Sequence, residues 1–222
     1  GAFPFVNPSS MTQHLTGGAS VSSISGQTLL LCDRIWDGAK ATMNSTATEA
    51  VSGTPVRYQS TTPTDPEFCG SNFLNIENGA APGGTALSAT AHNHTVIQYT
   101  DEAGNTAQTM PSMAGISGCL ASRFDMPLWH WFSPLAAGDT GIKEITQVQL
   151  SAGIAAGQIV YALKHPLAFF PNGGAQNFVP LDFINSAFSL ERILDDACLE
   201  LVQMPGTSGA TSYAGEFITY SN

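Results

Sequence analysis

Residues 95–110 read TVIQYTDEAGNTAQTM, and this stretch decides the fold class. Two segments rich in β-forming residues, 95–100 and 106–110, flank a polar connection of five residues, 101–105, which contains a glycine. Connections of this length with a glycine join the antiparallel strands of hairpins. The stretch therefore predicts a β-hairpin.

The rest of the chain also has the pattern of a β protein, because short apolar runs are separated by Gly, Pro, Ser, Thr and Asn. Segment 73–78, FLNIEN, alternates in period two, as a half-buried strand does. About seven or eight strands with turn signals at this spacing are typical of a β-sandwich, and long helices that would indicate a parallel sheet do not alternate with them. The other expected strands are 126–132, 142–150, 158–167, 198–204 and 216–220, while 28–36 is an apolar run and 40–59 is expected to be extended.

We therefore predict a mainly β protein, an antiparallel β-sandwich of jelly-roll type with one short helix over 189–196. Residues 1–27 are rich in Pro, Ser and Gly and are expected to form an extended N-terminal arm, followed by a single β-sandwich domain over 28–222. Phe3 and Phe5 in this arm are candidates for contact with a neighbouring subunit, and an ordinary fraying terminus is the alternative.

The charge composition favours a binding or structural role over catalysis. The 222 residues include only 7 Lys plus Arg and 17 Asp plus Glu, so the formal net charge is -10. Charged residues make up 11% of the chain, against roughly 25% in an average domain. A surface poor in charge suits contact with other protein, whereas nucleic acids and anionic membranes need clustered Lys and Arg. We expect neither of the latter two as a partner.

The four cysteines are scattered singly along the chain, at Cys32, Cys69, Cys119 and Cys198. Each lies beside apolar residues, which favours buried free thiols. Two disulfides are the alternative, and the sequence does not choose among the three possible pairings.

Two groups of residues are candidates for a binding site. His92 and His94 would share one face of an extended segment, but metal binding needs further ligands and none lies nearby in sequence. We interpret them as part of a polar loop that enters a strand, and we expect no metal. Trp129 and Trp131 could line a sugar-binding platform, although alternating aromatic residues in a central strand more often belong to the core.

No local catalytic motif occurs in the chain: there is no nucleophile elbow, zinc-protease helix, phosphate-binding loop or dinucleotide fingerprint. A Ser-His-Asp triad assembled from distant residues is the remaining route to an enzyme, and the abundance of Ser is no evidence for one. We therefore predict that the protein is not an enzyme and uses no cofactor.

Several short motifs follow one another in a fixed order. They include a Tyr-Thr-Asp hairpin with Gly104 and a Pro-Leu-Ala-Ala-Gly-Asp-Thr-Gly-Ile-Lys turn over 134–143. The other segments of the series are 28–34, 148–150, 163–167, 190–193 and 196–200. This order resembles a family of structural proteins of tailed-bacteriophage virions. The chain departs from the family pattern at Cys32 and in the long loop 60–72.

The resemblance implies a function. Members of the family resemble capsid decoration or other head-associated proteins, and the family has no catalytic residues to transfer. The implied role is a cement protein that binds the assembled head, with the major capsid protein and further copies of itself, in a dimer or trimer, as partners. It would be made in the bacterial host cytoplasm and would act on the capsid surface of the virion. A carbohydrate-binding or host-adsorption module is the alternative.

Overall fold

The computed structural model describes residues 11–221, except 82, 129, 173–174, 177, 186–189 and 205–211. Almost all regular structure in these residues is β, in antiparallel pairs, which confirms the predicted fold class. One short 3-10 helix, η1, covers Cys69–Ser71. The strands are β1 Gln13–Ser22, β2 Gln27–Ala39, β3 Glu49–Ala50, β4 Phe73–Asn78, β5 Asn93–Asp101, β6 Gln108–Thr109, β7 Met113–Ala114, β8 Ile142–Leu150, β9 Ile159–Asn172, β10 Val179–Asp182, β11 Arg192–Ile193, β12 Leu199–Met204 and β13 Tyr213–Ser221.

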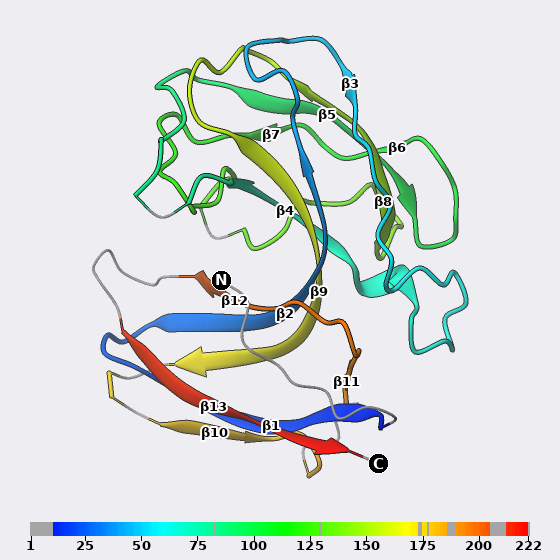
Figure 1. The fold of residues 1–222 in the computed structure, drawn as a ribbon, viewed down its shortest axis with the longest axis vertical. Coiled ribbons are helices and arrows are strands. Elements are labelled where there is room, and N and C mark those ends of the chain that lie inside the picture. Colours follow the sequence, from blue (N-terminus) through cyan, green and yellow to red (C-terminus); the bar gives the residue numbers. More distant parts are fainter. Residues whose placement is uncertain are drawn as a thin grey trace. The chain divides into compact units, whose positions relative to one another are not determined.

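The chain divides into two compact units. Unit 1 comprises Gly1–Arg34 and Pro166–Asn222, and unit 2 comprises Ile35–His165. Both boundaries fall inside long strands, β2 and β9 (Figure 1). No Pro- or Gly-rich linker marks the boundaries, so sequence composition gave no signal of the division.

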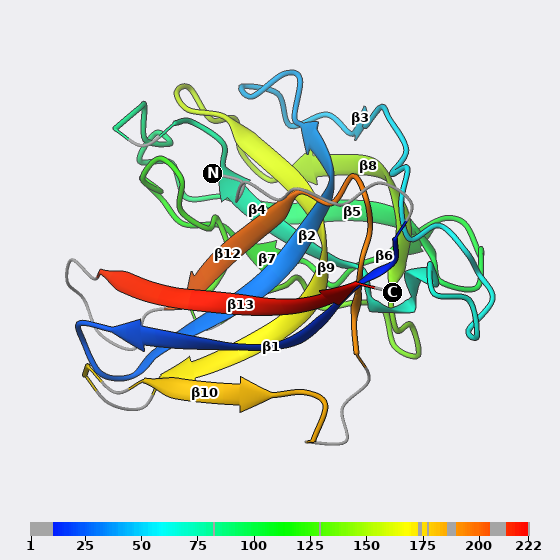
Figure 2. The ribbon, with the colours of Figure 1, turned by 60° about the horizontal axis from the view of Figure 1, so that its bottom comes forward.

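Unit 1 has the layered organisation of a sandwich. In one layer β1 lies between β10 and β13 (Figure 2), and in the other β2 pairs with β12. The side chains between them are aliphatic or aromatic, as the inner faces of two packed sheets require. The buried cluster comprises Leu15, Leu29, Leu31, Leu167, Phe170, Ile193 and Leu199.

The predicted arm over 1–27 is wrong for residues 13–22, because these form β1. The strand pairs with β13 along its whole length, and Gly17–Ser20 also pair with β10. The glycines that suggested a loose segment serve close strand approach instead. A Cβ atom at Gly17 would lie 2.8 Å from the carbonyl oxygen of Leu181, and one at Gly18 would lie 2.9 Å from that of Glu216. Phe3 and Phe5 lie outside the described residues.

The helix predicted over 189–196 is not formed by the described part of this segment, residues 190–196. It contains β11, which pairs with Gln13 and His14 of β1. The amide of Leu15 also donates to the carbonyl of Glu191, at 2.9 Å. Pairing with β1 thus uses the main-chain groups that a helix would bond internally, and it buries Ile193 in the core of unit 1.

Unit 2 is built around the pair β5 and β8, with β3 on β8, and β6 and β7 on β5 (Figure 1). The predicted hairpin is confirmed, since Gln98 pairs with Thr109 and Tyr99 with Gln108. Asp101 organises its connection, because one carboxylate oxygen accepts hydrogen bonds from the amides of Ala103 and Asn105.

The strand predicted over 126–132 is wrong for the described residues of that segment. They form bends and turns, and the side chain of Leu128 is 78% exposed. Phe132 stacks on Phe73 at 5.2 Å between ring centroids, so the aromatic residues that suggested a strand here pack through their side chains from a turn region.

All four cysteines have free thiols, as we expected. Cys32, Cys69 and Cys119 are buried, and Cys198 is partly buried.

Candidate functional site

The sugar-binding platform that we considered finds no support among the described residues. Trp129 lies outside them. Trp131 is partly buried, and its main-chain carbonyl accepts a hydrogen bond from Asn75 Nδ2 at 3.0 Å.

Unit 2 contains a buried cluster made of His92, His94 and Asp125. His92 directly precedes β5, and His94 is the second residue of that strand. Their spacing of two residues in extended chain places both rings on the inward face, while Asn93 between them is exposed. Asp125 comes from the loop that follows β7, and its main-chain amide donates to the carbonyl of Ile76 in β4.

The three side chains meet at one carboxylate oxygen. Asp125 Oδ2 lies 2.9 Å from His92 Nε2 and 3.2 Å from His94 Nε2. The side chains are completely shielded from solvent. The other carboxylate oxygen, Oδ1, accepts a hydrogen bond from the amide of Ile116 at 2.6 Å.

The far side of each imidazole ring also has a partner. His92 Nδ1 lies 3.0 Å from the carbonyl oxygen of Thr90, which can only accept. His94 Nδ1 lies 3.3 Å from the hydroxyl of Tyr161, a tyrosine that is itself fully buried. Each ring is therefore fixed in orientation, with Nε2 directed at Asp125.

The electrostatics of the cluster follow from burial and hydrogen bonding. Burial raises the pKa of Asp125, but hydrogen bonds from His92 and His94 outweigh that effect and hold the pKa well below its ordinary value. Burial lowers the pKa of His92, but hydrogen bonds to Asp125 and Thr90 outweigh it and raise the pKa. Burial raises the pKa of Tyr161 above its ordinary range. Asp125 is therefore an anion at neutral pH.

Sequence reasoning placed the two histidines on one face and missed Asp125. Asp125 is 33 residues away from His92 and 31 from His94 in the sequence. It directly precedes segment 126–132, which we expected to form a strand. No local pattern connects them. Only the packing of the loop against β4 brings the carboxylate to the rings.

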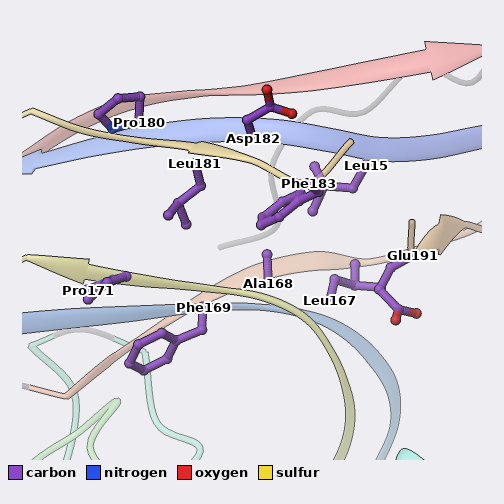
Figure 3. A pocket seen from close by; sticks show the side chains of 10 residues that line it. All are labelled: Leu15, Leu167, Ala168, Phe169, Pro171, Pro180, Leu181, Asp182, Phe183 and Glu191. Atoms are coloured by element: carbon purple, nitrogen blue, oxygen red, sulfur yellow. The ribbon is translucent and has the colours of Figure 1, made fainter. Parts of the chain in front are cut away.

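Unit 1 offers a different kind of feature, an apolar groove of about 590 Å³. Leu181 and Phe183 project from β10 and the residue after it toward Leu167 and Ala168 of β9 (Figure 3). Asp182 also lines the groove, but its carboxylate points away from Leu181 and Phe183 (Figure 3). The groove can take an apolar side chain.

The outer face of β13 adds exposed apolar surface to unit 1. Phe217 points inward and packs against Phe170, at 5.4 Å between ring centroids. The alternate residues Ile218 and Tyr220 are 53% and 59% exposed. Among the described residues, β13 pairs only with β1, so its second edge is an open edge.

None of the described residues belongs to a helix long and apolar enough to cross a membrane. No family model, no curated protein and no solved structure matches the chain.

Proposed function

We propose that this protein is a non-enzymatic structural protein of a tailed-phage virion, and within that class a capsid decoration protein that binds the assembled head. Its partners would be the major capsid protein and other copies of the same chain. The order of motifs that resembles this family supports the assignment, as does the low fraction of charged residues.

The observation that carries the proposal is the apolar outer surface of unit 1. Ile218 and Tyr220 stand on the outer face of a nine-residue strand whose second edge has no partner among the described residues. Open edges and exposed apolar residues are usually covered in an assembled protein, because they otherwise promote aggregation. A capsid lattice would cover such a surface on many copies at once, and weak contacts repeated on a lattice add up through avidity.

The proposal is tested by binding the purified protein to heads of the source phage from which the native copies have been removed. We expect Ile218→Asp to weaken binding at least tenfold, because it places a charge in the contact surface. Its melting temperature should stay close to that of the unmodified protein, since the side chain contributes little to the core.

The matched control is Val56→Asp, which changes an apolar residue of unit 2 that is even more exposed, at 76% against 53% for Ile218. This variant should bind heads normally. Equal binding by both variants and the unmodified protein would contradict the assigned contact surface. Absence of the protein from the head in cryo-microscopy of the source particle would contradict the function itself.

A further inference from the structure

The proposed virion function leaves the His92, His94 and Asp125 cluster of unit 2 without a role. The potential ligand atoms of these residues all lie within 4.8 Å of one another, and all three residues are buried. We propose that the cluster is a structural binding site for a divalent transition metal ion, with Zn²⁺ as the best chemical match.

The contacts around the cluster have the form that metal ligands need. A ligating histidine usually has its second ring nitrogen held by a carbonyl or another polar group, and a ligating carboxylate is itself hydrogen-bonded. His92 Nδ1 meets the Thr90 carbonyl, and Asp125 Oδ1 accepts from the Ile116 amide. The buried tyrosine hydroxyl holds the second nitrogen of His94. The remaining atoms, two Nε2 and one Oδ2, point at one another.

The distances are close to those of a metal site. Asp125 Oδ2 is 2.9 Å from His92 Nε2 and 3.2 Å from His94 Nε2. In a tetrahedral zinc site with bonds of about 2.0–2.1 Å, neighbouring ligand atoms are roughly 3.3 Å apart. Small outward shifts of the side chains would therefore admit the ion. The main-chain oxygen of Asp125, 3.1 Å from His94 Nε2, offers a fourth ligand.

The donor set indicates which ion fits. Two imidazoles and one carboxylate suit zinc, whereas Mg²⁺ and Ca²⁺ take oxygen ligands. The site is also closed. A Cβ atom at Gly115 would lie 2.1 Å from His92 Nε2, so the main chain packs directly against this side of the ring. Closed four-coordinate sites are structural, while catalytic sites keep a position open for water or substrate.

Without a metal, a proton would occupy the same place. His92 would then carry two protons and pair with Asp125 as an ion pair. The two states differ in metal content, so they can be separated by direct measurement without reference to head binding.

The experiment uses the intact protein, stripped with EDTA, dialysed and then equilibrated with ZnSO₄. We expect one zinc per chain by elemental analysis, and a melting temperature several degrees higher with zinc than without it, since an ion that binds the folded state stabilises it. Co²⁺ in place of Zn²⁺ should give the visible absorption of a tetrahedral complex. Asp125→Asn and His92→Gln should lose the bound metal.

The matched control is His165→Gln, which removes another buried histidine of unit 2, one that contacts Asn72 and Tyr58 and does not belong to the His92, His94 and Asp125 cluster. It should still bind one zinc. The proposal is overturned if the folded, unmodified protein binds no more zinc than Asp125→Asn does, shows no visible Co²⁺ spectrum and melts at the same temperature with and without zinc. If Asp125→Asn fails to fold, the test uses the metal-stripped unmodified protein alone, and compares its visible spectrum with and without Co²⁺ and its melting temperature with and without zinc.

Discussion

Single buried side chains in this protein are held by specific polar partners, and His165 is the clearest case outside the metal-ligand cluster. Its ring stacks on Tyr58, with centroids 3.8 Å apart, and its Nδ1 lies 3.0 Å from Asn72 Oδ1. Both amide hydrogens of Asn72 are donated to carbonyls, of Tyr58 and Ile142, so Oδ1 must accept and Nδ1 of His165 carries the proton. The ring is buried as the neutral form.

This burial predicts a loss of stability in mild acid. It lowers the pKa of His165 to about 4, against about 6.5 in an unfolded chain. Between these values the unfolded state binds the proton and the folded state does not, so the free energy of unfolding falls as the pH falls. The total loss from this residue approaches ~3 kcal/mol once the pH is below about 4.

Urea unfolding at pH 7 and pH 4.5 measures the effect. His165→Gln should be less stable at pH 7, because it loses the stacking on Tyr58, yet it should lose less stability than the unmodified protein on acidification. An identical pH dependence in the two proteins would show that His165 does not titrate on unfolding in this window.

At the scale of secondary structure, close strand approach in unit 1 depends on glycine. A Cβ atom at Gly18 would lie 2.9 Å from both the Glu216 carbonyl oxygen in β13 and a ring carbon of Phe170. We expect Gly18→Ala to destabilise the protein by about 1–3 kcal/mol in urea unfolding, the usual cost of overpacking a core. Thr219→Val, at an exposed position of β13, is the control and should stay within about 0.5 kcal/mol. Unchanged stability of Gly18→Ala would mean that β1 and β13 tolerate a wider spacing.

The same elements show how far sequence could lead. The hairpin of β5 and β6 was predictable, because the two strands follow each other closely in the sequence and Asp101 bonds within the turn, although the connection, 102–107, is longer by one residue than the five that we expected. Strand β1 was not predictable, because its glycines are typical of turns in the sequence. Their role in close strand approach is evident only once β10 and β13 are seen to flank the strand. Asp125 was missed for a similar reason. Its role depends on a contact across more than thirty residues, which no local periodicity records.

At the scale of the whole molecule, the proposed head-contact surface and the proposed metal site lie in different units. The apolar contact surface belongs to unit 1, and the proposed metal site belongs to unit 2. A variant in one unit should therefore leave the other property intact: Ile218→Asp should still bind zinc.

The N-terminal residues provide the last prediction. We propose that Phe3 and Phe5 contact a neighbouring subunit or the capsid. Burying two phenylalanine side chains would contribute roughly 3–6 kcal/mol before the cost of ordering the chain, and that cost, at about 1–2 kcal/mol for each residue, would offset much of the gain. Deleting residues 1–10 leaves β1 complete, because the strand begins at Gln13. The truncated protein should therefore bind heads more weakly, while its melting temperature changes little.

A head-binding titration and a thermal melt of the same preparation check both parts of this prediction. Replacing Phe3 and Phe5 together by Ala is the finer test, since it keeps the length of the segment and removes only the two rings. If both variants bind heads as tightly as the unmodified protein, the N-terminal segment makes no contact that matters, and the whole interface must lie on the folded units. If the deletion instead lowers the melting temperature by many degrees, residues 1–10 stabilise the fold of the isolated chain. A segment that contacts only a partner would not change the melting temperature in the absence of that partner.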